Sequence, residues 1–541
     1  MQINANIVDI SARRIYAGTI EISESRITAI HEEGEEDSDL PYALPGFIDA
    51  HIHIESSMLV PSEFAKMAVQ SGTVATVSDP HEIANVLGIE GVNYMLENAA
   101  QVPFKFFFGA PSCVPATAFE TAGDVLDASQ VRELLERDDI WYLSEMMNYP
   151  GVLHGDEQVM AKLKAAKDIG KPIDGHAPGL TGQDAVDYIN AGIETDHECF
   201  TYEEALWKLQ NGMKVIIREG SAAKNFEALY PLIDEFTDRV MLCSDDKHPD
   251  DLMVGHINQL VARAIGKGCD IYNVLRAACV NAVEHYKLPV GLLKAGDAAD
   301  LVLVEDLTSF DTLATLIDGK IIYAADTREG QATVAIPDIP IEPINNFSTN
   351  FKTVDEFETQ PHEGPRRIIK AIDGEIVTDE ITAEVANRDG IDIENDILKI
   401  VVVNRYSNQP PAIGFITGFG LKQGAIASSV AHDSHNIVAV GCDDFAIAHV
   451  VNLVIEASGG VAASDTEDDA LLSLPVAGLM SDQSGVEAAK GYTAVDTFAK
   501  EKLGSVLAAP FMTLSFMALL VIPKLKLSDL GLFDGEKFEF V

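Results

Sequence analysis

A short apolar strand that ends in His-x-His, Leu44 to His53, sets the strongest limit on the architecture of this chain. It follows a Pro-Gly pair, and its isoleucines predict a buried strand. Side chains alternate between the two faces of a strand, so Asp49, His51 and His53 share one face. Two imidazoles on one rigid face can bind a single divalent metal ion. His-x-His alone is equally compatible with an ordinary polar strand end, so the rest of the chain has to decide.

Strands alternate with helical segments downstream of this motif. We expect eight strands, at 44–53, 73–78, 104–109, 140–145, 171–175, 192–195, 214–217 and 239–243. Amphipathic stretches such as 156–169 and 182–191 fall between most of them. This alternation predicts an α/β fold built as a closed (β/α)8 TIM-like barrel. An open doubly wound sheet is the second choice, because no Gly-x-Gly-x-x-Gly follows an early strand.

Segments with a strand pattern flank the expected barrel on both sides. Residues 1–43 and 287–336 are expected to pair in one small β-sandwich domain, with the barrel at 44–286 between them. Three prolines at 337, 340 and 343 mark a linker. Residues 345–541 are then expected to form a separate C-terminal domain of mixed α/β type.

The charge of the chain limits its partners. There are 85 Asp and Glu against 38 Lys and Arg, a formal net charge of -47. Such a surface repels nucleic acid and anionic lipid, and we expect neither as a partner. Six scattered cysteines form no Cys-x-x-Cys pair, the N-terminus has no signal-peptide pattern, and the apolar stretch 511–523 is too short to span a bilayer. We therefore expect a soluble cytoplasmic protein.

Metal-binding side chains recur at the ends of the expected strands, where barrels of this type carry their chemistry. The set comprises His51, His53, Glu145, His176, His197 and Asp245. Together they offer nitrogen and oxygen ligands for two metal ions, with no thiolate. Glu145 is placed to bridge the ions, which would lower the pKa of bound water. Asp245, on the last strand and so beside the first, could orient that water and shuttle its proton.

These residues carry a resemblance to the amidohydrolase superfamily and, within it, to the bacterial and archaeal adenine deaminase family. It extends over nearly the whole chain and is carried by Pro-Gly-Phe-Ile-Asp-Ala-His-Ile-His at 45–53, Asp-Pro-His-Glu at 79–82, Glu-Met-Met-Asn at 145–148, Arg-Glu-Gly-Ser-Ala at 218–222, Ser-Asp-Asp at 244–246, Gly-Asp-Ala-Ala-Asp-Leu-Val-Leu at 296–303, Ala-His-Asp-Ser-His-Asn at 431–436 and Pro-Lys-Leu-Lys-Leu at 523–527.

The resemblance implies hydrolytic deamination of adenine to hypoxanthine and ammonia, a purine salvage reaction. It implies that the six residues bind two ions per subunit, Mn²⁺ or Fe²⁺ with Zn²⁺ as a further option. Glu145 would take the place of the carboxylated lysine that bridges the metals in many relatives.

Attack at C6 of adenine builds charge on ring N1, so a proton donor there lowers the barrier. Glu219 is the first candidate donor, with His81 and Glu82 behind it, although ion pairing is an equally good explanation for all three. Glu82, Met146, Met147 and Asn148 are candidates for substrate binding. We interpret 432–435, His-Asp-Ser-His, as a polar surface turn outside the catalytic site. A further metal site or a lid that reaches the pocket is the alternative.

Two alternative functions remain open at this stage. A hydrolase of cyclic amides or ureides could use the same barrel, although it would normally carry the bridging lysine. A catalytically silent metal-binding scaffold is the second alternative, although such chains usually lose ligands. The zinc deaminases that use Pro-Cys-x-x-Cys are excluded, because that motif is absent. We expect a homo-oligomer, a dimer or larger.

Overall fold

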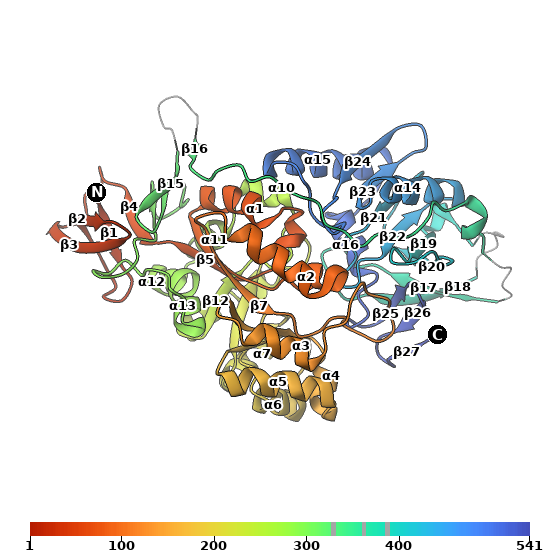
Figure 1. Cartoon of the computed structure of the whole chain (residues 1–541), viewed down its shortest axis with the longest axis horizontal. Helices are drawn as coiled ribbons and strands as arrows, with labels where there is room; N and C mark the ends of the chain where they lie inside the picture. The colour runs from red at the N-terminus through yellow and green to blue at the C-terminus, as the bar shows by residue number, and fades with distance from the viewer. Residues whose placement is uncertain (326–331, 360–363, 385–389) are drawn as a thin grey trace.

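Eight parallel strands form the centre of the structure (Figure 1). This computed structural model describes residues 1–325, 332–359, 364–384 and 390–541. The strands are β5 (Phe47–Ile52), β6 (Thr73–Ser78), β7 (Lys105–Ala110), β8 (Ile140–Met146), β9 (Ile173–Gly175), β10 (Thr195–Asp196), β11 (Lys214–Arg218) and β12 (Val240–Cys243). Each corresponds to one of the eight predicted strands.

The eight strands pair in chain order, as sheets of five (β5 to β9) and three (β10 to β12). Backbone hydrogen bonds also cross both gaps between the sheets. Glu194 N–H donates to Ile173 O at 2.9 Å, and Asp245 N–H donates to His51 O at 3.0 Å. The last strand therefore lies beside the first, and the carboxyl ends of all eight strands face the same end of the structure.

Helices connect the strands along the outside, as the segment between β8 and β9 illustrates. Helix α5 (Glu157–Ile169) begins after Asp156, whose carboxylate accepts hydrogen bonds from two backbone N–H groups of the first turn. Such a cap contributes about 1 kcal/mol. The helix buries Val159, Leu163 and Ala166 on one face and ends at Gly170, whose φ of 80° suits a residue without Cβ.

The predicted first strand is wrong in one respect, because it divides at Gly46. A Cβ on Gly46 would lie 2.3 Å from a methyl carbon of Val74, so the chain passes too close to β6 for any other residue. Residues before this point form β4 (Tyr42–Pro45), which belongs to a different sheet. Of the predicted strand 44–53, only the part that forms β5 belongs to the parallel strands at the centre.

That second sheet contains eight strands in the order β16-β15-β14-β13-β4-β1-β2-β3 and lies at one end of the molecule (Figure 1). Its strands are β1 (Gln2–Asp9), β2 (Arg14–Ser23), β3 (Arg26–Gly34), β4, β13 (Leu301–Val304), β14 (Thr312–Ile317), β15 (Lys320–Ala324) and β16 (Thr333–Val334). Strand β4 pairs with β1 on one side and β13 on the other, so N-terminal residues and the segment after the parallel strands share one sheet.

The C-terminal part forms a third unit at the opposite end (Figure 1). Its sheet runs β18 (Asp379–Ala383), β17 (Arg366–Lys370), β20 (Ala412–Thr417), β19 (Leu398–Val403), β22 (Ile437–Gly441), β21 (Ala425–Ser428), β23 (Gly460–Ser464) and β24 (Asp469–Ser473). Helices α14 (Asp444–Glu456), α15 (Gly485–Thr497) and α16 (Pro510–Phe516) and the small sheet β25 (Leu525–Ser528), β26 (Gly531–Asp534) and β27 (Glu539–Phe540) complete it.

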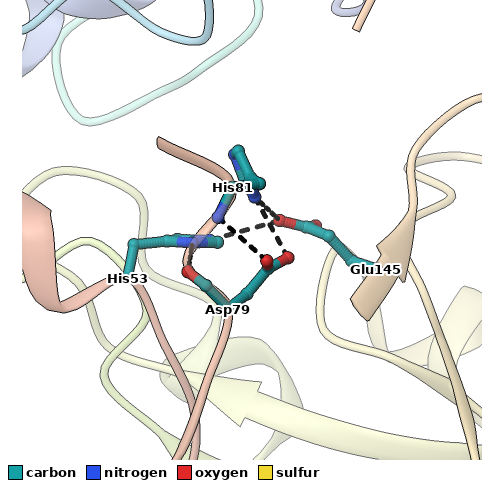
Figure 2. Close-up of side chains that lie close together, drawn as sticks. All are labelled: His53, Asp79, His81 and Glu145. Atoms are coloured by element: carbon teal, nitrogen blue, oxygen red, sulfur yellow. Dashed lines mark hydrogen bonds and ion pairs between the residues drawn. The ribbon is translucent and has the colours of Figure 1, made fainter. Parts of the chain in front are cut away.

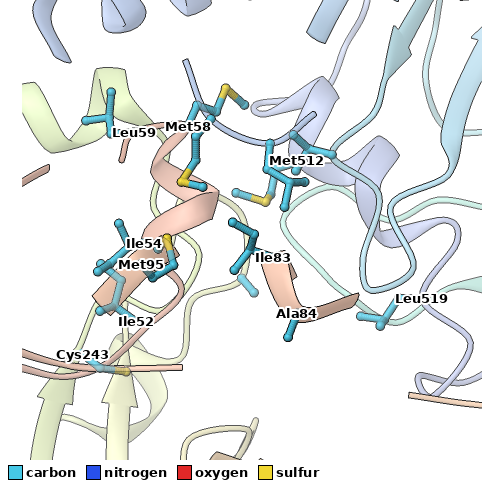
Figure 3. Packing of buried hydrophobic residues seen from close by; sticks show 14 of the residues in the cluster. Ile52, Ile54, Met58, Leu59, Ile83, Ala84, Met95, Cys243, Met512 and Leu519 are labelled. Atoms are coloured by element: carbon cyan, nitrogen blue, oxygen red, sulfur yellow. The ribbon is translucent and has the colours of Figure 1, made fainter. Parts of the chain in front are cut away.

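The C-terminal part packs directly onto the parallel-strand unit. One cluster of buried apolar side chains contains Ile83 and Ala84 from helix α2 (His81–Ala99) together with Met512 and Leu519 (Figure 3). A shared apolar core fixes two units relative to each other more firmly than a polar contact would. In the described ranges, no helix combines the length and apolar character needed to cross a membrane.

Candidate metal centre and substrate cavity

The six predicted metal ligands lie together at the carboxyl ends of the strands, with the carboxylate of Glu145 at their centre. One oxygen of Glu145 lies 3.2 Å from His53 Nε2 and 3.9 Å from His51 Nε2. The other oxygen lies 2.7 Å from His176 Nδ1 and 3.2 Å from His197 Nε2. All of these side chains are buried. The two Glu145 oxygens thus face two different pairs of imidazoles, as a bridging carboxylate must.

The first-strand pair has the geometry of a metal-binding pair. His51 Nε2 and His53 Nε2 face each other at 3.2 Å, and only one proton can lie between them. His53 Nδ1 lies 3.2 Å from Asp79 O, so its N–H donates there and Nε2 is the nitrogen that remains to bind a metal ion. Buried nitrogen and oxygen donors without a thiolate suit divalent ions of the first transition row. The residues present therefore fit divalent metal ions.

Asp245 faces the same two imidazoles as Glu145, those of His53 and His197, and is tightly held. Its carboxylate accepts a hydrogen bond from Arg218 at 2.5 Å and lies 3.4 Å from His53 Nε2. Burial alone would raise the pKa of Asp245, but Arg218 and the facing His197 hold it well below its usual range. Its backbone has a φ of 54°, a left-handed conformation that costs energy in a residue with a side chain. Such strain is typical of functional positions.

Opposite charges in the cluster shift its pKa values strongly. Burial would raise the pKa of Glu145, but His176 and His197 lower it well below its usual range. Burial would likewise lower the pKa of His197, but Glu145 and Asp245 raise it to about 9. Without metal, the cluster therefore holds a proton on His197 at neutral pH.

A bound metal has to displace that proton, which predicts a pH-dependent affinity. We expect the affinity of the metal-free protein for Mn²⁺ to rise from about pH 7 to about pH 9, by about tenfold per pH unit for each proton displaced. Isothermal titration in buffers of different ionisation enthalpy measures both the affinity and the protons released. An affinity independent of pH over this range would contradict the prediction.

His81 and Glu82 are the first two residues of α2, and His81 lies beside the cluster (Figure 2). His81 Nδ1 lies 3.0 Å from Asp79 Oδ2 and 3.5 Å from a Glu145 oxygen. Its Nε2 is buried without a hydrogen-bond partner among the described residues. Both side chains line the central cavity, as does Met147.

Three other predicted site residues lie away from this cavity. The Glu219 carboxylate pairs with Arg263 at 2.5 Å and lines a separate surface depression, because the chain turns outward after Arg218. Met146 packs against Cys113 in the core. The side chain of Asn148 accepts a hydrogen bond from Gly151 N–H and caps helix α4 (Tyr149–His154). Their placement argues against contact with a substrate in the cavity.

The prediction of a polar surface turn at 432–435 is wrong, since all four side chains are buried. Contacts with Glu82 explain why this turn is buried. One of its oxygens lies 2.6 Å from His432 Nδ1, and the other is hydrogen-bonded to His435 Nε2. A turn of the C-terminal part is thus bound to a carboxylate that precedes it by 350 residues. No local sequence pattern reports such a long-range contact.

Several residues of the site were not predicted from the sequence. Arg218 pairs with Glu198, whose carboxylate lies 3.7 Å from both His176 Nδ1 and His197 Nε2. Asp246 accepts a hydrogen bond from Ser56 Oγ at 2.6 Å. Glu198 and Asp246 each directly follow a predicted ligand in the sequence, which is the signal that could have identified them.

A small cavity opens above the cluster. Its floor is polar and comes from the strand ends, including Glu145, His197 and Asp245. The opposite wall comes from the C-terminal part. That wall consists of Ile376, His432, Asp433, Phe516 and Leu519. A polar floor facing a largely apolar wall is typical of sites for small, flat ligands.

Lys526, on β25, supports this wall from behind. The side chain is fully buried, and its Nζ donates to Ile376 O at 2.8 Å and Phe516 O at 2.9 Å. Burial lowers the pKa of Lys526 to about 7. The amine is therefore largely neutral in the folded protein above pH 7, whereas an unfolded lysine stays charged until about pH 10.4.

The stability of the protein should therefore depend on pH through Lys526. From about pH 7 to about pH 10.4 the unfolded state binds more protons, so stability rises with pH by up to about 1.4 kcal/mol per unit from this group. In Lys526→Met we expect a flatter dependence of the melting temperature on pH. Lys490→Met, at an exposed site on α15, is the control and should keep the wild-type slope. Equal slopes in wild type and Lys526→Met would contradict the prediction.

Both the N-terminal and the C-terminal part of the chain match known protein families. Residues 42–322 match the amidohydrolase family, and residues 375–539 match the adenine deaminase C-terminal domain. The chain is 54% identical to the adenine deaminase of Sulfurovum sp. (strain NBC37-1), over 100% of this chain and 99% of that protein. It is 54% identical to the adenine deaminase of Methanosarcina acetivorans, over 99% and 98%, and 47% identical to that of Borreliella burgdorferi, over 100% and 99%. A solved beta-aspartyl dipeptidase from Fervidobacterium islandicum covers 60% of this chain, and the chain covers 97% of it, at 16% identity with a TM-score of 0.46.

Proposed function

The chain belongs to the adenine deaminases of the amidohydrolase family, and on this basis we propose how its buried cluster performs the reaction. The reaction is the hydrolysis of adenine to hypoxanthine and ammonia. Full-length similarity to adenine deaminases favours this reaction over the two alternatives considered from the sequence, a cyclic amide hydrolase and a silent scaffold.

We assign two divalent ions to the cluster, Mn²⁺ or Fe²⁺ with Zn²⁺ as the further option. His51, His53 and Asp245 would hold one ion, and His176 and His197 the other. Glu145 would bridge them. The observation that carries this assignment is the position of the two Glu145 oxygens, each facing its own pair of imidazoles. When bound, such ions lower the pKa of water toward neutrality and so supply the nucleophile.

Asp245 handles the proton of the attacking water in this proposal. Arg218 keeps its carboxylate ionised, so the carboxylate can accept a proton from the water and return it to the departing amine nitrogen. His81 takes the role first considered for Glu219, that of donor to ring N1. His81 lines the cavity, and its Nε2 has no hydrogen-bond partner among the described residues. Burial would lower the pKa of His81, but Asp79 and Glu82 raise it well above its usual value.

The test is incubation of the manganese-reconstituted protein with adenine, following hypoxanthine and ammonia together. Release of both products in equal amounts is the expected result. Opening of a cyclic amide with adenine untouched would contradict the substrate assignment, and inactivity toward both with metal bound would favour the scaffold.

Further properties of this protein belong to the same proposal. We propose a closed (β/α)8 barrel that begins at β5 and extends to residue 286. It is flanked by a small β domain formed by the residues before Gly46 and by 287–336, and by the C-terminal domain at 345–541. The hydrogen bonds across both gaps between the parallel strands support closure. Six buried cysteine thiols suit a reducing cytoplasm, where purine salvage takes place. A homo-oligomer stays a prediction.

A further inference from the structure

We propose that Asp433 of the C-terminal domain accepts a hydrogen bond from the imidazole-ring N–H of adenine and thereby restricts the enzyme to the free base. The inference deepens the proposed function and rests on it. It also gives the C-terminal domain a role in catalysis that the metal ligands, all from the parallel-strand unit, leave unexplained.

Asp433 lines the cavity and has one unpartnered carboxylate oxygen. Its side chain is buried, and its Oδ2 has no hydrogen-bond partner in the described portion of the chain. The other oxygen lies 3.9 Å from His81 Nε2, beyond hydrogen-bonding distance. A buried carboxylate oxygen without a donor is costly, so a donor is expected from a molecule that occupies the cavity.

The two imidazoles next to Asp433 are both bound to Glu82. Ala431 N–H donates to His435 Nδ1, so the proton of that ring lies on Nε2 and is donated to Glu82. His432 Nδ1 is bound to the other Glu82 oxygen, and its ring is stacked on Phe516 at 5.4 Å. Among the described cavity residues from this domain, Ile376, Phe516 and Leu519 are apolar, and the unpartnered side-chain atoms are His432 Nε2 and Asp433 Oδ2. Of these two, Asp433 offers the carboxylate acceptor.

The chemistry of adenine provides the matching donor. C6 must face the strand ends, where the attacking water is activated, so the edge of adenine remote from C6, which carries N3 and N9, points toward the opposite wall. The five-membered ring carries one N–H, at N7 or N9 according to tautomer, and its other nitrogen only accepts. A substituent at N9 removes the N–H of the N9 tautomer and adds atoms on the side that faces this wall. The wall is therefore matched to adenine and mismatched to its nucleoside.

The experiment compares adenine with 9-methyladenine, whose five-membered ring has no N–H. In Asp433→Ala we expect kcat/KM for adenine to fall about 10- to 100-fold, the range for a hydrogen bond to a charged group. We expect the affinity for 9-methyladenine, measured as a competitive inhibition constant, to fall much less. Asp433→Asn keeps one neutral acceptor and should lie between wild type and Asp433→Ala.

Asp529→Asn is the matched control. Asp529 is a buried carboxylate that joins the same two units, through Thr121 N and Asn404 Nδ2, without lining the cavity. It should leave the preference for adenine over 9-methyladenine unchanged. An Asp433→Ala enzyme with full metal content and the wild-type preference would overturn the inference. A wild-type enzyme inactive on adenine would instead overturn the proposed function.

Discussion

Replacement of Glu145 by glutamine is expected to remove bound metal and abolish deamination. A carboxylate shares its negative charge between two oxygens, and each Glu145 oxygen faces a different pair of imidazoles. An amide offers one neutral oxygen and an NH₂ group that repels a cation, so it cannot bridge two ions. We expect metal content to fall below two ions per subunit and kcat to drop by more than about 10³-fold, because the nucleophile depends on the ions. Elemental analysis and an adenine assay measure the two effects.

Glu55→Gln is the matched control for this experiment. Glu55 is a buried glutamate near the cluster that does not line the cavity. Burial raises the pKa of Glu55 to about 7, so the native residue is partly protonated at neutral pH and a neutral amide resembles it. We expect this variant to retain both ions. A Glu145→Gln enzyme with two ions and wild-type kcat would refute the bridging role.

The strand-end residues could be predicted because their positions depend on local periodicity. A parallel barrel places the ends of all its strands around one opening, so His51, His176 and Asp245 can be grouped without coordinates. Periodicity does not predict which way side chains point once a strand has ended. The chain leaves β11 immediately after Arg218, and which of two adjacent residues faces inward depends on the turn that follows. Arg218 points into the site and Glu219 out of it.

The far wall of the cavity could not be predicted in the same way. His432 and His435 are buried because Glu82 binds both, and Phe516 lies beside His432 because helix α16 packs there. Polar residues in a turn between strands are normally exposed, so the local pattern indicates a surface position. Only the packing of one unit on the other, through side chains such as Ile83 and Met512, reverses that expectation.

Asp245→Asn is expected to lower kcat by about 10²- to 10⁴-fold while KM for adenine changes little. The carboxylate held ionised by Arg218 is a weak base, so its contribution is to position the attacking water and transfer its proton to the amine nitrogen. The amide can hold a water molecule but cannot accept its proton. KM should be preserved because Asp245 lies on the polar floor, away from the wall that contacts the five-membered ring. Steady-state kinetics with saturating Mn²⁺ separate the two constants.

Since Asp245 is also a proposed ligand, loss of metal has to be distinguished from loss of the proton acceptor. Asp174→Asn provides the comparison, because Asp174 is a buried carboxylate on β9 that accepts a hydrogen bond from Tyr286 Oη at 2.7 Å and does not line the cavity. Burial raises the pKa of Asp174 to about 7, so its amide should change kcat little. If Asp245→Asn retains two ions and still loses activity, proton transfer is the missing step, because positioning by the metals is intact. If it retains two ions together with wild-type kcat, the proton acceptor must be another group of the floor, with Glu198 the nearest carboxylate bound to the same arginine.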